Sequence, residues 1–304
     1  MSTASGSGRF AGQVALVTGS SRNIGKAVAG AFARDGAAVV LNASRSADEL
    51  DTARSELESA GADVLAVLAD LGDPEAANGL VAQVLARFGR IDVLVICHST
   101  RPLTPLLDTS DEQWHEQITI NLHSAMYLCR AALPVMVQRG RGSVITVTNG
   151  GRFVSAKYPR HAAFAALAGR LTFMRSLLYE FAPSGIRFNF VGPGIMDTVR
   201  KNPEWYPDIP DGIPQNNPAV LASIPLGARR PAGGGRSGGA VAGLRRGRLC
   251  QRRDDRRHRR LEHVRAASRR GACRRARPGP YDAGAALAST SEGVPDTHLP
   301  STAL

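Results

Sequence analysis

The chain of 304 residues is 43% hydrophobic and 21% charged, which is typical of a globular α/β protein and argues against a wholly disordered one. Its formal charge of +12 comes from the last quarter, because residues 228–304 carry 18 of the 38 Lys and Arg but only 6 of the 26 Asp and Glu. Residues 1–227 hold 20 charges of each sign and are neutral, so nothing in their net charge favours a polyanion partner.

The sequence gives no sign of export, membrane insertion or metal binding. Its four cysteines form no CxxC pair or other metal-ligand spacing: Cys97, Cys129, Cys250 and Cys273. The first ten residues hold no apolar signal segment, and no run of 18 apolar residues occurs. We therefore expect a reduced, cytoplasmic protein with no metal site and no membrane contact.

Short apolar runs alternate with longer amphipathic runs from Gln13 to about Val191, which predicts repeated β-α-β units around a parallel sheet. Strands are expected over 14–18, 38–41, 64–69, 93–97, 143–147 and 186–191. Helices are expected over 24–34, 47–60, 74–88, 111–138 and 160–182. Right-handed connections then give an α/β fold with a doubly wound parallel sheet, a Rossmann fold in a single domain, whose ligand site lies at the carboxyl ends of the strands.

The pattern changes after Pro193-Gly194. Within the predicted domain, 1–227, residues 192–227 are rich in proline and polar side chains, which predicts an irregular substrate lid. Residues 228–304 form an Arg/Gly/Ala-rich tail without strand or helix periodicity, and they cannot bury enough surface to offset the entropy lost on ordering. We expect no nucleic-acid partner, because the Arg-rich run 252–260 has no interleaved aromatic side chain for base stacking.

Residues 18–25 read Thr-Gly-Ser-Ser-Arg-Asn-Ile-Gly and stand between the first predicted strand and the first predicted helix. A pyrophosphate there can accept hydrogen bonds from free backbone N–H groups at the positive end of the helix dipole. The segment is similar to the Thr-Gly-x-x-x-Gly-x-Gly loop of the short-chain dehydrogenase/reductase family, and the resemblance runs from about residue 10 to residue 227. Asn23 replaces the middle glycine, and since asparagine tolerates left-handed backbone, we expect the turn to survive.

Three further matches carry the resemblance. Asp70-Leu71 follows the third predicted strand, where the family contacts adenine, and Pro193-Gly194 matches its nicotinamide-side turn. Asn121 matches a catalytic asparagine, although Asp70 or Asn121 alone could equally be a helix cap or a buried polar residue. The resemblance implies that a dinucleotide contacts the following residues: Gly19, Ser21, Arg22, Asn23, Ile24, Gly25, Ser44, Arg45, Asp70, Leu71, Pro193 and Gly194.

The end of the second predicted strand favours NADP(H) as the cofactor. NAD enzymes with this fold place an acidic residue there for the ribose hydroxyls, whereas this chain has Ala43, followed by Ser44 and Arg45. Arg22 adds a second cation on the same side, and a guanidinium can bind a phosphate through two hydrogen bonds. The two arginines and the missing acid predict a site for the 2'-phosphate of NADP(H).

The catalytic positions depart from the family pattern. The resemblance implies a Tyr that donates a proton, a Lys four residues later that lowers its pKa, and a Ser that polarises the substrate oxygen. Alignment puts Ala163 and Leu167 at the Tyr and Lys positions, and Asn149 at the Ser position. All lysines of the chain lie elsewhere: Lys26, Lys157 and Lys201. We therefore expect carbonyl reduction by the family mechanism to be crippled.

Other polar residues are candidates for the missing roles. Asn121 is the one catalytic residue of the family pattern that this chain keeps, although the family uses it to hold a water against the Lys that is absent here. Tyr158 and His161 lie just before Ala163, and His98 follows the fourth predicted strand, where a His of near-neutral pKa could act as acid or base. Asn149 could donate a hydrogen bond to an oxyanion. Alternatively, Tyr158 and His161 are loop residues at the start of a helix, and His98 is a buried structural residue.

Three classes of function remain open. The first, which we favour, is a ketoreductase-like NADP(H) oxidoreductase with a small-molecule substrate and an unusual proton donor, with secondary metabolism as a candidate setting. The second is a non-redox enzyme on the same scaffold, such as a cyclase, isomerase or dehydratase. The third is a catalytically silent nucleotide-binding subunit. Binding of NADPH, measured separately from its consumption, distinguishes the three.

The tail has the features of a frame-shifted ending. Read one base forward, codons that encode residues 250–264 also permit Val-Asn-Gly-Ala-Thr-Ile-Ala-Val-Thr-Gly-Gly-Trp-Asn-Met, which resembles the last strand of the family and its Gly-Gly turn. The same shift turns residues 232–237 into Pro-Glu-Glu-Val-Ala and residues 242–246 into Leu-Ala-Ser-Asp. We therefore expect the basicity of residues 228–304 to carry no function, and a homo-oligomer to form only with the native ending, because losing that strand exposes a sheet edge.

Overall fold

The computed structural model of the protein describes residues 8–148, 160–193, 196–198 and 230–231. All of these fall within Met1–Cys250, one compact unit. Three of the predicted site residues, Asn149, Tyr158 and Gly194, lie outside the described residues, as do most of the predicted lid and tail.

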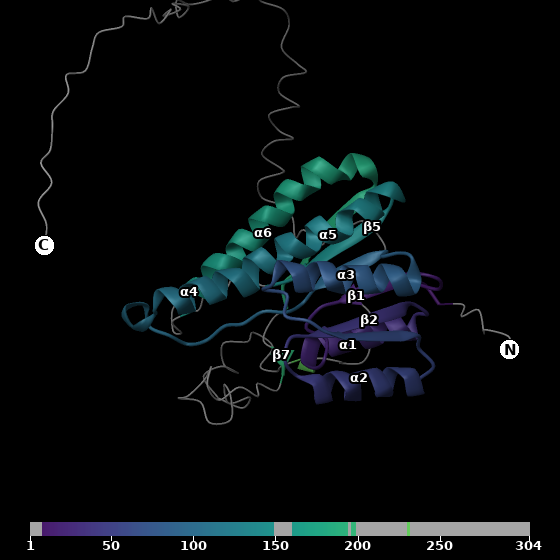
Figure 1. Ribbon diagram of the computed structural model, residues 1–304, viewed down its shortest axis with the longest axis horizontal. Helices are drawn as coiled ribbons and strands as arrows, with labels where there is room; N and C mark the ends of the chain where they lie inside the picture. Colours follow the sequence, from purple (N-terminus) through teal and green to yellow (C-terminus); the bar gives the residue numbers. More distant parts are fainter. Residues whose placement is uncertain (1–7, 149–159, 194–195, 199–229, 232–304) are drawn as a thin grey trace, which may run out of the picture. The chain divides into compact units, whose positions relative to one another are not determined.

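Strands and helices alternate along the described chain (Figure 1). The strands are β1 (Val14–Val17), β2 (Ala38–Ala43), β3 (Val64–Leu68), β4 (Val93–Ile96), β5 (Gly142–Val147) and β6 (Ile186–Val191). The helices are α1 (Asn23–Arg34), α2 (Ala47–Ser59), α3 (Pro74–Phe88), α4 (Asp111–Ile118), α5 (Ser124–Gln138) and α6 (His161–Phe181). The predicted α/β fold is confirmed, with most element ends within one residue of those expected.

The six strands form one parallel sheet in the order β3-β2-β1-β4-β5-β6. Val17 of β1 pairs with Leu41 of β2 on one side and with Val95 of β4 on the other. The chain order therefore reverses at β1, and a crevice for a ligand is expected where the carboxyl ends of β1 and β4 diverge.

Both faces of the sheet are buried, which explains why its strands read as continuous apolar runs. Leu16 and Leu94 belong to one core, which packs under α3, α5 and α6. Val17 and Phe32 belong to the other, which packs under α1 and α2. Figure 1 shows these two helical layers on opposite sides of the strands.

Side chains near the helix ends explain where two of the helices begin. At α3, the carboxylate of Asp73 accepts a hydrogen bond from the N–H of Glu75, and Pro74 fills the first helical position. At α4, the side chains of Ser110 and Gln113 each bond the other residue's backbone N–H in a capping box. These capping residues are local in the sequence, and they explain why α3 and α4 begin at the residues that were expected.

The helical stretch expected over 111–138 is confirmed in its bounds, but it is not α-helical throughout. A π-helical segment, Thr119–His123, separates α4 from α5. Within it, Asn121 is fully buried, donates to Thr100 O (2.8 Å) and accepts from Thr100 N (3.0 Å). The wider turn lets this amide bind the chain that follows β4, a long-range contact that helical periodicity cannot reveal.

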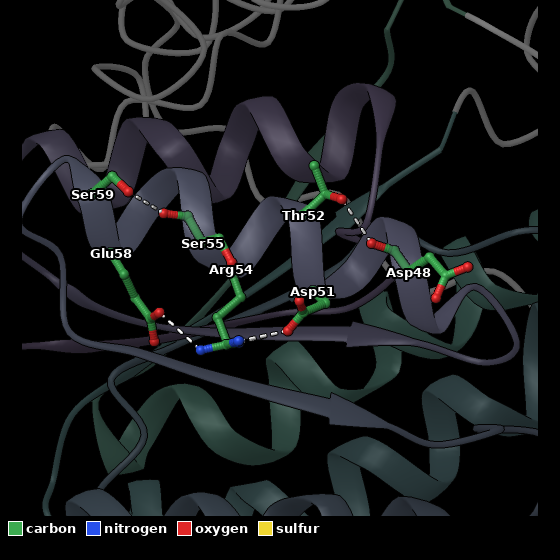
Figure 2. A network of polar contacts seen from close by, with 7 residues as sticks. All are labelled: Asp48, Asp51, Thr52, Arg54, Ser55, Glu58 and Ser59. Atoms are coloured by element: carbon green, nitrogen blue, oxygen red, sulfur yellow. Dashed lines mark hydrogen bonds and ion pairs between the residues drawn. The ribbon is translucent and has the colours of Figure 1, made fainter.

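Residues of α2 form a network of polar contacts along the outer face of the helix (Figure 2). Arg54 donates to Asp51 (2.5 Å) and to Glu58 (2.8 Å) along the helix. Thr52 and Ser59 each donate a hydroxyl hydrogen bond to the carbonyl four residues earlier, on Asp48 and Ser55. Exposed pairs of this kind stabilise a helix only slightly, and we assign them no functional role.

β6 forms one edge of the sheet, and no other described residue pairs with its outer side. Two residues of the predicted lid form β7 (Met196–Asp197), which pairs in parallel with β8 (Arg230–Pro231) at the start of the predicted tail.

Every helix in the described part of the chain is too short or too polar to span a bilayer. The same residues contain no group of His, Cys, Asp and Glu side chains suited to a metal ion.

Asp92 should contribute strongly to stability. Its buried carboxylate accepts from Val14 N (3.0 Å) and binds Arg90 through two hydrogen bonds (2.6 and 2.7 Å). We expect Asp92→Ala to lower the free energy of unfolding by about 2–3 kcal/mol in urea denaturation, because a buried amide and a guanidinium lose their acceptor. Asp63→Ala, which removes the exposed partner of Arg87, is the control, with a loss below about 1 kcal/mol. Equal losses in the two variants would contradict this role.

Candidate cofactor site

The turn after β1 leaves no room for side chains at two glycines. Gly19 has a φ of +61°, and a Cβ there would lie 2.8 Å from the Cα of His98. A Cβ on Gly25 would lie 2.1 Å from the carbonyl oxygen of Gly19. Asn23 takes the left-handed conformation expected of it, with a φ of +51°. The turn therefore keeps the tight shape that brings backbone close to a ligand.

Ser20 and Asn42 fasten this turn to the end of β2. The N–H of Ser20 donates to Asn42 O (2.9 Å), and the N–H of Asn42 donates to Ser20 Oγ (3.0 Å). The amide of Asn42 also donates to Ala69 O (3.1 Å), beyond the end of β3. Both residues are buried, so the carboxyl ends of three strands are held by one polar network.

A cavity of about 360 Å³ follows the carboxyl edge of the sheet. Its lining runs from Asp70 after β3, past Gly19 after β1, to Pro193 after β6. It contains every predicted cofactor-binding residue that the structure describes: Gly19, Ser21, Arg22, Asn23, Ile24, Gly25, Ser44, Arg45, Asp70, Leu71 and Pro193. Residues from four segments of the sequence thus line one space at the crevice that the strand order creates.

The β2 end of the cavity is lined by two arginines, one of which is paired with a carboxylate. Ser44 and Arg45 are exposed on it, beside the buried Ala43. Arg22 donates to Glu49 (3.1 Å) in the first turn of α2. Glu49, which the sequence analysis did not consider, can therefore compete with a bound anion for Arg22.

The other end of the cavity contains His98 and Cys97. The ring of His98 contacts Thr18 Oγ1 through Nδ1 (2.8 Å) and Ser124 Oγ through Nε2 (2.7 Å). Because Ser124 Oγ donates to Ile120 O (2.6 Å), the neutral imidazole fits both partners if Nε2–H donates to Ser124 and Nδ1 accepts from Thr18, whose hydroxyl then points to Nδ1 and not to the more distant Val95 O (3.3 Å).

Burial sets the protonation of these two side chains. Burial, together with the positive charge of Arg170, lowers the pKa of His98 to about 3. Burial raises the pKa of the Cys97 thiol to about 11, against the opposing effect of Arg170 and Arg101. At neutral pH both groups are therefore uncharged, which favours the structural alternative for His98 over its use as an acid.

The remaining described candidates lie away from the cavity lining. Asn121 is buried behind it, with its amide engaged by Thr100 and by Gln117 Oε1 (3.3 Å). His161 is exposed at the first residue of α6. Ala163 and Leu167, at the family's Tyr and Lys positions, are both buried on that helix.

Sequence reasoning missed Arg170, although its position carried a signal. It stands in the otherwise apolar stretch of α6 from Ala162 to Leu171, where an arginine is unusual. The structure buries it completely, and its guanidinium donates to His98 O (3.1 Å) and Val147 O (3.3 Å), both on residues that line the cavity.

Comparison with known proteins assigns the chain and its fold to a family. The family model described as short chain dehydrogenase matches residues 13–206. The chain belongs to the short-chain dehydrogenase family. The resemblance seen in the glycine turn and the segments after the strands is thereby confirmed at the level of the family, which includes oxidoreductases.

Similar proteins include oxidoreductases with different substrates. An L-rhamnose 1-dehydrogenase (NAD(P)(+)) of a Sphingomonas species is 33% identical over 193 residues, which cover 63% of this chain and 76% of that protein. A 3-oxoacyl-[acyl-carrier-protein] reductase of Escherichia coli is 31% identical over 226 residues, covering 72% and 84%. A metagenomic short-chain oxidoreductase solved in complex with NADP superposes with a TM-score of 0.56 at 33% identity, covering 61% and 84%.

The neutrality of His98 can be tested through the pH dependence of stability. Because the folded-state pKa of about 3 lies below the ordinary value of about 6.5, the unfolded chain takes up the proton first. The contribution of a neutral His98 to the free energy of unfolding is therefore complete above pH 6.5. It is lost as the pH falls toward 3, by at most about 1.4 kcal/mol per pH unit.

We expect the free energy of unfolding of the wild-type protein, measured in urea, to fall with this slope as the pH is lowered from 6.5 toward 3. In His98→Gln it should fall less steeply over the same pH range. His115→Gln, on the exposed surface of α4, is the control and should keep the wild-type slope. Identical slopes in all three proteins would show that His98 is not held neutral.

Proposed function

We propose that this protein is an NADP(H)-binding oxidoreductase that acts on a small carbonyl or alcohol substrate without the tyrosine and lysine typical of its family. The cavity along the carboxyl edge of the sheet carries the proposal. It combines the glycine turn after β1, the polar end of β2 and the segment after β6 in one continuous lining. NADP(H) would supply or accept the hydride.

The residues at the two ends of the cavity fit this cofactor. In the described first turn of α1, no side chain caps the helix and no residue is acidic, so its backbone N–H groups can donate to a pyrophosphate. At the end of β2, Ala43 brings no carboxylate, and Arg22 and Arg45 can bind the 2'-phosphate. The solved relative that contains NADP is consistent with this choice.

Of the two candidates near the start of α6, proton donation is assigned to Tyr158, because His161 is exposed and lies away from the cavity lining. Ala163 and Leu167 have no ionisable group, and His98 is neutral with both ring nitrogens engaged. His161 begins the helix that carries these positions, and Tyr158 precedes it by three residues in the sequence. Asn149 would donate a hydrogen bond to the substrate oxygen. A protein that binds NADPH but consumes none with any carbonyl substrate would instead be a silent subunit or a non-redox enzyme.

The preference for NADP(H) depends on Arg45, Arg22 and Glu49. We expect Arg45→Ala to weaken NADPH binding about 10- to 100-fold, because a charged hydrogen bond to phosphate is lost, and to leave NADH binding unchanged. Glu49→Gln should strengthen NADPH binding by freeing Arg22.

Titration of nucleotide fluorescence measures these affinities. Arg54→Ala, on the exposed face of α2, is the matched control and should bind like wild type. Equal affinities of the wild-type protein for NADH and NADPH would remove the basis for the charge argument.

Restoring the family pair should raise reductase activity. Ala163 and Leu167 lie one turn apart on the buried side of α6, so Ala163→Tyr with Leu167→Lys would rebuild the pair there. General acid catalysis is worth about 100- to 10,000-fold, and we expect the double variant to gain at least tenfold in NADPH consumption with simple ketones. Ala163→Phe with Leu167→Met is the control. Wild-type turnover already equal to that of active relatives would contradict the assignment.

We also propose that residues 228–304 arise from a shifted reading frame and lack their own function. The family model ends at residue 206, and the described part of the sheet ends at β6, whose outer edge could accept a further strand. Resequencing the gene tests this. A base gained or lost near codons 227–231 is expected, and restoring the frame should raise the Tm and allow a homo-oligomer in the reducing cytoplasm. An intact frame together with a protease-resistant tail would refute the proposal.

A further inference from the structure

Arg170 is a buried cation directly behind the cofactor cavity. It is the largest of the fully buried side chains in the described chain, with an exposed fraction of 0%. Its two terminal nitrogens donate to the carbonyl oxygens of His98, after β4, and Val147, at the end of β5. No described group accepts from its Nε. The guanidinium therefore joins the carboxyl ends of two neighbouring strands.

Among the described residues no carboxylate neutralises the charge of Arg170, since both of its hydrogen-bond acceptors are backbone carbonyls. Burial lowers the pKa of its guanidinium to about 10, with Arg101 adding repulsion, so the group stays protonated at neutral pH. The thiols of Cys97 and Cys129 are neutral, since burial raises their pKa values to about 11 and about 12. His98 is neutral as well.

We propose that Arg170 is a positioning and specificity residue that places a fixed positive charge behind the β4–β5 end of the cavity, so that the site binds the reduced dinucleotide in preference to the oxidised one. The inference rests on the proposed function. The oxidised nicotinamide ring is a cation and the reduced ring is neutral, while the phosphates are the same in both. Arg170 therefore repels only the oxidised ring, and poor screening in a buried setting strengthens that repulsion.

The placement of this charge explains why it should act on the ring and not on the phosphates. His98 and Val147, whose carbonyls Arg170 binds, line the cavity on the side of β4 and β5. The turn after β1 and the arginines Arg22 and Arg45 lie toward β2, where the pyrophosphate and the 2'-phosphate are proposed to bind. Of the groups in a bound dinucleotide, the nicotinamide would thus be the one nearest to Arg170.

The test measures the dissociation constants of NADPH and NADP+ separately for four proteins. They are the wild type, Arg170→Lys, Arg170→Met and, as the control, Arg175→Met on the exposed side of the same helix. We expect the wild type and Arg175→Met to prefer NADPH, and Arg170→Lys to keep that preference because the charge remains. In Arg170→Met the ratio of the two constants should shift about tenfold toward NADP+.

The outcomes separate this inference from the proposed function. Failure of the wild type to bind either nucleotide overturns both. Binding of both nucleotides without a preference for NADPH, or an unchanged ratio in Arg170→Met, overturns the role of Arg170 alone. A shift of the same size in Arg170→Lys would assign the effect to packing and overturn the charge argument.

A second variant and a spectroscopic measurement keep the test decisive if Arg170→Met does not fold. If circular dichroism shows that Arg170→Met is unfolded, Arg170→Gln replaces it, since its amide can still donate to a carbonyl but carries no charge. Histidine NMR should also show a higher pKa for His98 in the neutral variants than in Arg170→Lys, because the repelling charge is gone. A purely structural arginine would not separate the Lys variant from the neutral ones in this way.

Discussion

The close contact between Gly19 and the chain after β4 is the constraint on which the site depends. The backbone of His98 approaches the α-carbon of Gly19 so closely that a methyl group cannot fit between them. That contact brings the end of β1 against the end of β4, the two strands between which the sheet changes direction. The glycine turn, the crevice and the position of His98 are therefore consequences of one steric requirement.

Buried polar side chains at the strand ends hold the walls of the cavity in place. Ser20 and Asn42 connect the ends of β1, β2 and β3, whereas Arg170 connects the ends of β4 and β5. Each of these groups satisfies backbone atoms that the sheet leaves unpaired where its strands end. Because such networks are costly when incomplete, they favour one arrangement of the strand ends over others.

The fold was predictable from the sequence because its signals are local. Short apolar runs marked the strands, and longer amphipathic runs marked the helices. The cofactor-binding candidates were also predictable, since Gly19, Asn23 and Arg45 stand in short segments tied to strand ends. The partners of Arg22, His98 and Asn121 were not, because Glu49, Ser124 and Thr100 are brought to them only by the tertiary fold. Arg170 was missed because an isolated polar residue in an apolar helix does not reveal which backbone atoms it will meet.

The π-helical segment between α4 and α5 has a consequence for how this protein can change. A π turn contains one residue more than the α-helical turn it replaces. Deleting a single residue from Thr119–His123 would restore a continuous α-helix and leave α5 in its packed register. Because the π turn and the α turn each complete one full rotation, α4 would also keep its orientation around the helix axis. What the deletion would remove is the wide turn that lets Asn121 bind Thr100, so the extra residue serves the chain after β4 and not the packing of the two helices.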